Sequence, residues 1–295
     1  MRNVNSIPNS NVSANANPPT KSHRPRPKYL SHLILIVICF VVGFPMLFTI
    51  LKSTQNLAQI NAFPPFLGVG DQIAQNYSDA FTTTNLAQLM GNTILVAVVI
   101  TLGKTITSLL AGTAFVYFRF PLRGFLFIFV LLTLMMPTDI LVVALYRMMG
   151  QLHWINTFQA LIAPFLASAT GVLLFRQHFS NIPAELADAA QIDGANPLRF
   201  LWSILIPLSW NVIGALGMIQ FIYAWNQYLW PLLVVSDNNR ELVQVALKGI
   251  TASALDLGNW GVAMAAAVIA SIPPLIVFLV LQESFLRGFT LTHEK

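Results

Sequence analysis

The residue triplet closest to a nucleotide-binding motif is Gly103-Lys104-Thr105. A phosphate-binding loop of that type needs a glycine five residues before Gly103, because the glycines let backbone N–H groups surround the phosphates. Val98 occupies that position, and the triplet lies in a long apolar run. The five histidines lack the paired spacing of metal ligands, and the sequence has no Gly-x-Ser-x-Gly elbow. We therefore expect no catalytic residue, no metal and no cofactor on this chain.

Two charged residues, Lys104 and Asp139, lie inside apolar runs. Lys104 precedes Arg119 by fifteen residues, about 22 Å of helix, and Asp139 follows Gly124 by the same number. On neighbouring antiparallel helices the two charges reach similar depth, where an unpaired charge costs at least about 2.5–3.5 kcal/mol. One hypothesis is a structural ion pair, and another is a direct role in the path of a solute. If the two helices end at residues other than Arg119 and Gly124, Lys104 and Asp139 no longer lie at the same depth.

A polar and aromatic stretch interrupts the apolar run that follows residue 206. An aromatic belt or hydrogen bonding between helices is one interpretation of it. The other is the wall of a translocation path, since amides and aromatic faces suit a polyol or a sugar. The residues concerned are Gln220, Tyr223, Trp225, Asn226 and Gln227.

The composition indicates an integral membrane protein. Of the 295 residues, 56% are apolar and only 9% are charged, whereas an ordinary soluble domain is about 25% charged. The net charge of +5 comes from 16 Lys and Arg that bracket the apolar runs instead of forming one basic face, which argues against nucleic acid as a partner. The single cysteine, Cys39, excludes a disulfide framework within the chain.

Six apolar runs are long enough to cross a bilayer, which takes roughly 20 residues. We expect an all-α membrane protein with a permease domain at 30–289, a disordered tail at 1–29 and a short tail at 290–295. The expected spans are Leu33–Leu51, Leu89–Phe115, Phe125–Leu145, Phe158–Phe175, Pro207–Trp230 and Val262–Leu281.

The distribution of basic residues sets the orientation, because cytoplasmic loops carry more Lys and Arg. The two tails, the connection between spans two and three and the connection between spans four and five together hold eleven Lys and Arg, against four on the opposite side. We therefore expect both termini in the cytoplasm. The eleven are Arg2, Lys21, Arg24, Arg26, Lys28, Arg119, Arg123, Arg176, Arg199, Arg287 and Lys295, and the four are Lys52, Arg147, Arg240 and Lys248.

The connection at 182–207 is predicted to contain a short helix. Pro183 opens it and Glu185 lies in its first turn, where a negative charge suits the helix dipole. Gly194 supplies a stop, and Asn196-Pro197 forces a turn. From these features alone, an ordinary connector helix is one interpretation, although the alanines leave one side thin enough for another surface to approach.

The same connection resembles the EAA loop of ABC-importer permeases. The pattern is Asp188-Ala189-Ala190, Gly194 four residues later, and Ile204-Leu205-Ile206-Pro207, with Asp188 where that family usually has Glu. Arg119-Phe120-Pro121, Trp225-Asn226 and Pro273-Pro274 are similar to the carbohydrate-type subfamily. Segments at 119–123, 167–177 and 221–232 most resemble permeases of sn-glycerol-3-phosphate importers.

The resemblance implies a type I ABC-importer permease fold in the bacterial inner membrane, with six spans. It implies a homologous, non-identical permease subunit, two ABC ATPase subunits that use ATP, an extracytoplasmic solute-binding protein and membrane lipid as partners. The ATPase-docking loop would comprise Glu185, Asp188, Ala189, Ala190, Asp193, Gly194, Ala195 and Pro207.

The implied solute is sn-glycerol-3-phosphate or a related glycerophospho compound, with a sugar, glycoside or polyol as the alternative. A secondary transporter is the alternative from another class. The six apolar runs show no obvious inverted halves, and a self-sufficient carrier needs no docking loop, so we expect the importer subunit.

Overall fold

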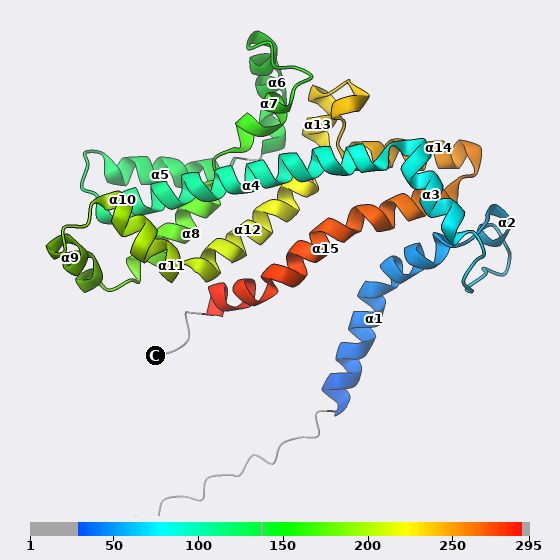
Figure 1. The fold of residues 1–295 in the computed structure, drawn as a ribbon, viewed down its shortest axis with the longest axis horizontal. Helices are drawn as coiled ribbons and strands as arrows, with labels where there is room; N and C mark the ends of the chain where they lie inside the picture. The colour runs from blue at the N-terminus through cyan, green and yellow to red at the C-terminus, as the bar shows by residue number, and fades with distance from the viewer. Residues whose placement is uncertain (1–28, 137, 291–295) are drawn as a thin grey trace, which may run out of the picture. The chain divides into compact units, whose positions relative to one another are not determined.

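The computed structural model describes residues 29–136 and 138–290, and these residues form helices joined by turns and loops (Figure 1). The chain divides into two compact units, Met1–Pro45 and Met46–Lys295. The elements are α1 (Tyr29–Lys52), α2 (Leu57–Ile60), α3 (Ile73–Thr84), α4 (Leu86–Tyr117), α5 (Arg123–Leu134), the 3-10 turn η1 (Thr138–Leu141), α6 (Val142–Gln151), α7 (Phe158–Ile162), η2 (Ala163–Phe165), α8 (Ala169–Ser180), α9 (Ala184–Ile192), α10 (Pro197–Phe200), the π-helical turn η3 (Leu201–Leu205), α11 (Ile206–Leu208), α12 (Trp210–Trp225), α13 (Leu229–Val234), η4 (Asn238–Arg240), α14 (Val243–Leu257) and α15 (Trp260–Thr290).

Four of the expected spans correspond to helical segments that are long and apolar enough to cross a membrane. Within the described residues these segments are Tyr29–Lys52, Leu86–Tyr117, Phe158–Ser180 and Trp260–Leu286. A fifth candidate is the bent pair Pro197–Leu208 and Trp210–Trp225, whose two parts meet at 80°.

The third, fourth and fifth expected spans are not continuous helices; the fourth consists of α7, η2 and α8, which begins at Ala169. In the third, α5 ends at Leu134 and α6 begins at Val142. The residue before a proline disfavours the α conformation, and Pro137 follows the end of α5 closely. The twelve residues of α5 extend about 18 Å, well below the roughly 30 Å of a hydrocarbon core. The fifth expected span bends at Ser209, and its helix α12 ends at Trp225, before the expected end at Trp230.

Helix α4 is the central element of the second unit. Helices α8 and α12 pack against it, and α15 packs along α12. In Figure 1, α9 and α10 lie near one end of α4, whereas α3 and α14 lie near the other. The residues that follow α1, at 53–55, are held to α3 by Asn76, whose Nδ2 donates to the carbonyl oxygens of Ser53 and Gln55 at 2.9 and 3.0 Å.

Close contact between α4 and α8 depends on glycine. A Cβ built on Gly171 would lie 2.2 Å from Ser108 Oγ and 2.8 Å from Ser108 Cβ. Small residues let helix backbones approach in lipid, where van der Waals packing drives association. Gly171 therefore sets the distance between these two helices at the level of residue 108.

We predict that Gly171→Ala lowers the thermal unfolding midpoint of the detergent-purified protein, because overpacking costs about 1–3 kcal/mol. Combining it with Ser108→Gly, which removes both clashing atoms, should recover part of that loss. The control is Gly91→Ala on α4, where nothing lies within 4 Å of the added Cβ. Equal midpoints for Gly171→Ala and Gly91→Ala would contradict the close-contact assignment.

Candidate functional site: a buried lysine cavity and an exposed connecting helix

Helix α9 occupies the connection in which a short helix was predicted. The backbone N–H of Leu186 donates to the Pro183 carbonyl oxygen at 3.2 Å in the first turn, where Glu185 also lies. The helix ends with Asp193 as its C-cap, and Gly194 follows in the left-handed conformation at φ 71°. The Ala195 N–H donates to the Ala190 carbonyl oxygen at 2.9 Å and closes this end.

One side of α9 packs on the protein, and the other is exposed. Ala190 is buried in the apolar cluster formed with Leu109, Phe175 and Phe200, and Ala187 and Ala195 pack against that cluster. The rest of the predicted docking residues, including Pro207 in α11, are exposed: Glu185, Asp188, Ala189, Asp193, Gly194 and Pro207. Ile192 is 86% exposed and Leu198 is 63% exposed, so this surface also carries apolar side chains.

The segment after α9 is anchored on its inner side. Asn196 caps α10 through its Oδ1, which accepts from the Arg199 N–H at 2.7 Å. The ring of Phe200 packs edge-on against Tyr117 at the end of α4, with 5.1 Å between centroids. At the bend, both donors of Ser209 are satisfied, because its N–H and Oγ donate to the Leu205 carbonyl oxygen at 3.0 and 2.6 Å. These contacts join α10 and the bend at Ser209 to the body of the protein directly after α9.

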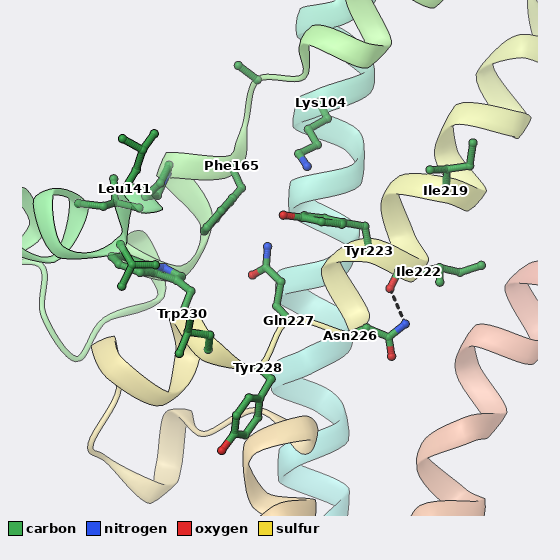
Figure 2. A pocket seen from close by; sticks show the side chains of 15 residues that line it. Lys104, Leu141, Phe165, Ile219, Ile222, Tyr223, Asn226, Gln227, Tyr228 and Trp230 are labelled. Carbon is green, nitrogen blue, oxygen red and sulfur yellow. Dashed lines mark hydrogen bonds between the residues drawn. The ribbon is translucent and has the colours of Figure 1, made fainter. Parts of the chain in front are cut away.

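A cavity of 660 Å³ lies between α4, α12 and the segments on either side of α7 (Figure 2). Lys104, Tyr223 and Gln227 line it together with apolar side chains and two further polar ones. The complete lining described is Lys104, Leu141, Val142, Leu145, Pro164, Phe165, Ala167, Ile219, Ile222, Tyr223, Asn226, Gln227, Tyr228, Leu229 and Trp230. Four of the seven residues predicted for a translocation path thus line one space: Lys104, Tyr223, Asn226 and Gln227.

Lys104 is held by a polar chain that crosses three helices. Its Nζ donates to Gln220 Oε1 at 2.9 Å, and Gln220 Nε2 donates to Ser168 Oγ at 3.1 Å. Ser168 also caps α8 by accepting from the Gly171 N–H at 3.1 Å. The Lys104 ammonium lies 4.5 Å from the centroid of the Tyr223 ring, a cation–π contact. Lys104 itself is 7% exposed.

The predicted ion pair with Asp139 falls outside the described side chains. The backbone at 138–141 forms η1, so the continuous helix from which the depth of Asp139 was calculated is interrupted. The partner that the structure gives Lys104 is Gln220. Gln220 was predicted to line the path. It is not in the described cavity lining, and it instead accepts the hydrogen bond of Lys104.

The chain is irregular between α12 and α13, at the cavity wall. Asn226 ends α12, its Nδ2 donates to the Ile222 carbonyl oxygen at 2.9 Å, and its Oδ1 accepts from Gln244 Nε2 at 3.3 Å. Both side-chain polar atoms of Gln227 are buried, and neither has a hydrogen-bond partner in the described structure. Non-helical backbone at membrane depth is tolerated where protein or a water-filled cavity covers it.

Trp225 lies away from the cavity. It is 1% exposed in the core, and its ring stacks on Phe221 with 5.7 Å between centroids. Sequence reasoning missed the wall at 164–167 and the supporting residue Ser168. Pro164 within an apolar run and a serine before the next helical run were the available signals.

A second hollow, of 400 Å³, lies among α3, α4, α14 and α15 and has the opposite charge character. Glu241 lines it, together with Thr83, Thr84 and Asn259. Burial raises the pKa of the Glu241 carboxyl above its usual value. An ionised carboxylate repels anions, so the lysine cavity is the better candidate for a negatively charged solute.

The chain is similar to one known protein family and to several known permeases. The family model described as "Binding-protein-dependent transport system inner membrane component" matches residues 104–290. The chain is 38% identical to the sn-glycerol-3-phosphate transport system permease protein UgpE of Brucella melitensis, covering 92% of this chain and 99% of that protein. It is 37% identical to the protein of the same description in Escherichia coli O1:K1, covering 90% and 97%.

The fold is similar to that of a chain in the crystal structure of a bacterial ABC transporter involved in the import of the acidic polysaccharide alginate. The TM-score is 0.77 over 87% of this chain and 95% of that chain, at 22% sequence identity. A second structure, of an alginate ABC transporter in complex with an alginate pentasaccharide-bound periplasmic protein, gives a TM-score of 0.60 at 14% identity. These likenesses extend over nearly all of the described residues.

We predict that Gly194→Val abolishes ATP-dependent uptake, whereas Gly194→Asn retains most of it. A β-branched residue resists the left-handed conformation, and Asn adopts it at little cost. No atom lies within 4 Å of a Cβ built on Gly194, so steric conflict inside this chain does not contribute. The measurements are ATP-dependent uptake and the amount of protein in the membrane. Equal loss in both variants would mean that a partner surface contacts Gly194 too closely for any side chain.

Proposed function

Because this chain belongs to the family of binding-protein-dependent transport system inner membrane components, we propose that it is the permease subunit through which an importer moves sn-glycerol-3-phosphate or a related glycerophospho compound. The chain is a multi-pass permease of the inner membrane and is not itself catalytic. Partner ATPase subunits hydrolyse the ATP that drives transport.

One observation carries the choice of solute: Lys104 lines the cavity and is the charged residue in its described lining. A buried ammonium attracts an anion strongly, because the surrounding dielectric constant is low. Relatives that match nearly end to end are named as sn-glycerol-3-phosphate permeases, which supports the same solute class. A sugar, glycoside or polyol remains the alternative, since Tyr223, Asn226 and Gln227 suit hydroxyl groups in general.

Exposed α9 is the proposed docking element for the ATPases. Asp188, Ile192 and Leu198 offer a charge and two apolar side chains to a partner, while Ala190 holds the inner side of the helix to the permease. Closure of two ATPase subunits would push α9, and with it α10 and the adjoining end of α8. The two arrangements of the permease pair would follow this rigid-body motion.

The proposed assembly contains one copy of this chain, a homologous non-identical permease subunit, two ABC ATPases and an extracytoplasmic solute-binding protein, all in membrane lipid. The proposed topology is the six-span type I arrangement with cytoplasmic termini. The eleven-to-four distribution of basic residues supports the orientation. In this topology α5 and the bent segment at 197–225 complete the third and fifth crossings together with the residues that follow them. A self-sufficient secondary transporter is disfavoured, because it would have no use for α9 as a docking element.

The test of the proposed function is reconstitution of the complete importer in liposomes. Binding protein loaded with sn-glycerol-3-phosphate should stimulate ATP hydrolysis several-fold and drive ATP-dependent uptake of the labelled solute. Binding protein offered a disaccharide or glycerol should leave both rates at their basal values. Stimulation by a neutral sugar alone would reject the solute but keep the permease role. Uptake without ATPase subunits would reject the importer itself.

The topology is tested with single cysteines in a Cys39→Ser background. A cysteine at Ala195, beside α9, should react with an impermeant thiol reagent only from the cytoplasmic side, and one at Asn238, in η4, only from outside. Both positions are in exposed or half-exposed segments, so access is not limited by burial. The reverse pattern would overturn the orientation and the docking role of α9 together.

A further inference from the structure

We infer that the 660 Å³ cavity is a solute subsite with two chemically different ends, in which Lys104 binds the anionic group and Gln227 binds hydroxyl groups. This inference rests on the proposed function and adds to it that this subunit itself holds the solute. It also assigns the orientation of the solute within the cavity.

The anionic end follows from the contacts of Lys104. An ammonium group has three N–H donors, and the described structure uses one of them, to Gln220 Oε1. Gln220 is neutral, and no carboxylate is among the described side chains that line the cavity. The ammonium also faces the neutral Tyr223 ring at 4.5 Å, so no described group cancels its charge, and that charge remains available to a ligand. Charge-assisted hydrogen bonds to phosphate are the strong ones.

The hydroxyl end follows from Gln227. Its amide offers two donors and an acceptor, all buried and without described partners. A buried amide left unpaired is costly, and a ligand hydroxyl can both donate to its oxygen and accept from its nitrogen. In Figure 2 the Gln227 amide and the Lys104 ammonium point toward the same space, and the Tyr223 ring lies between them. Polar groups are thus placed at both ends of an aromatic wall.

Gln220 and Ser168 are positioning residues in this inference. Ser168 Oγ accepts from Gln220 Nε2 at 3.1 Å, which fixes the amide so that its oxygen faces Lys104. Without that bond the amide could turn its own N–H groups toward the ammonium. The pair therefore holds Lys104 at the cavity wall while leaving its charge unneutralised.

The experiment measures solute retention in the complete importer. The complex is trapped with ATP, vanadate and binding protein carrying radiolabelled sn-glycerol-3-phosphate, and the label that stays with the washed membrane complex is counted. We expect Lys104→Met to lose retention about tenfold or more, because it removes a charge-assisted bond. We expect Gln227→Leu to lose about three- to tenfold. Lys104→Arg should recover most of the retention, since it restores the charge.

Gln220→Glu separates a positioning role from a purely structural one. The change keeps the shape of the side chain but places a carboxylate beside Lys104, so retention should fall about tenfold. The unfolding midpoint should stay the same or rise, because the new pair is oppositely charged. Arg147→Met, which removes an exposed positive charge on α6 outside the cavity, is the matched control and should retain the solute as wild type does.

The outcomes distinguish this inference from the proposed function. If the wild-type complex traps nucleotide but retains no sn-glycerol-3-phosphate and is not stimulated by it, the proposed solute is wrong. If the wild type is stimulated and Lys104→Met retains as much solute as Arg147→Met, the subsite is wrong and the proposed function stands. A fall in unfolding midpoint that fully accounts for the loss in every variant would likewise overturn the subsite.

Discussion

Lipid offers no hydrogen-bond partners, so each polar group inside this permease needs a partner from the protein or from its ligand. The regular helices meet this requirement within their own backbones. The bend at Ser209 meets it with two bonds to the Leu205 carbonyl oxygen. The break after α12 meets it only in part, through Asn226, and leaves the Gln227 amide unpaired. Trp225 Nε1 and His178 Nε2 are also buried without a partner in the described structure, but of these three side chains Gln227 is the one that lines the cavity, where a ligand would be able to reach it.

The same constraint explains the chain of contacts behind the cavity. Lys104, Gln220 and Ser168 come from α4, from α12 and from the cap of α8, and their hydrogen bonds join the three helices at one level. An apolar side chain would pack there without the cost of a buried charge. A lysine supported by a neutral amide is therefore costly for stability, and the proposed role in recognising an anion would account for that cost.

Helix α8 connects the two candidate functional regions of the molecule. Its first turn is capped by Ser168 beside the cavity, and its last residue, Ser180, lies four positions before α9. Phe175 and Phe179 bury its middle against the cluster that also holds Ala190. Its position makes α8 a physical connection between the proposed solute cavity and the proposed docking helix α9, and the close contact of Gly171 with Ser108 ties it to α4.

The sequence by itself determined the membrane environment, through the composition and the Lys/Arg bias, and the family, through the residue pattern at 182–207. It also determined the local structure of that segment, because Pro183 and Gly194 act on the backbone of nearby residues. The end of α9 at Ile192, followed by Gly194 at positive φ, confirms the predicted helix stop. Only the tertiary structure decided where the third, fourth and fifth runs break, that Trp225 belongs to the core, and that Ser168 supports Gln220 from 52 positions away. Helical periodicity specifies which residues share a face, but which face meets a cavity depends on packing between helices distant in sequence.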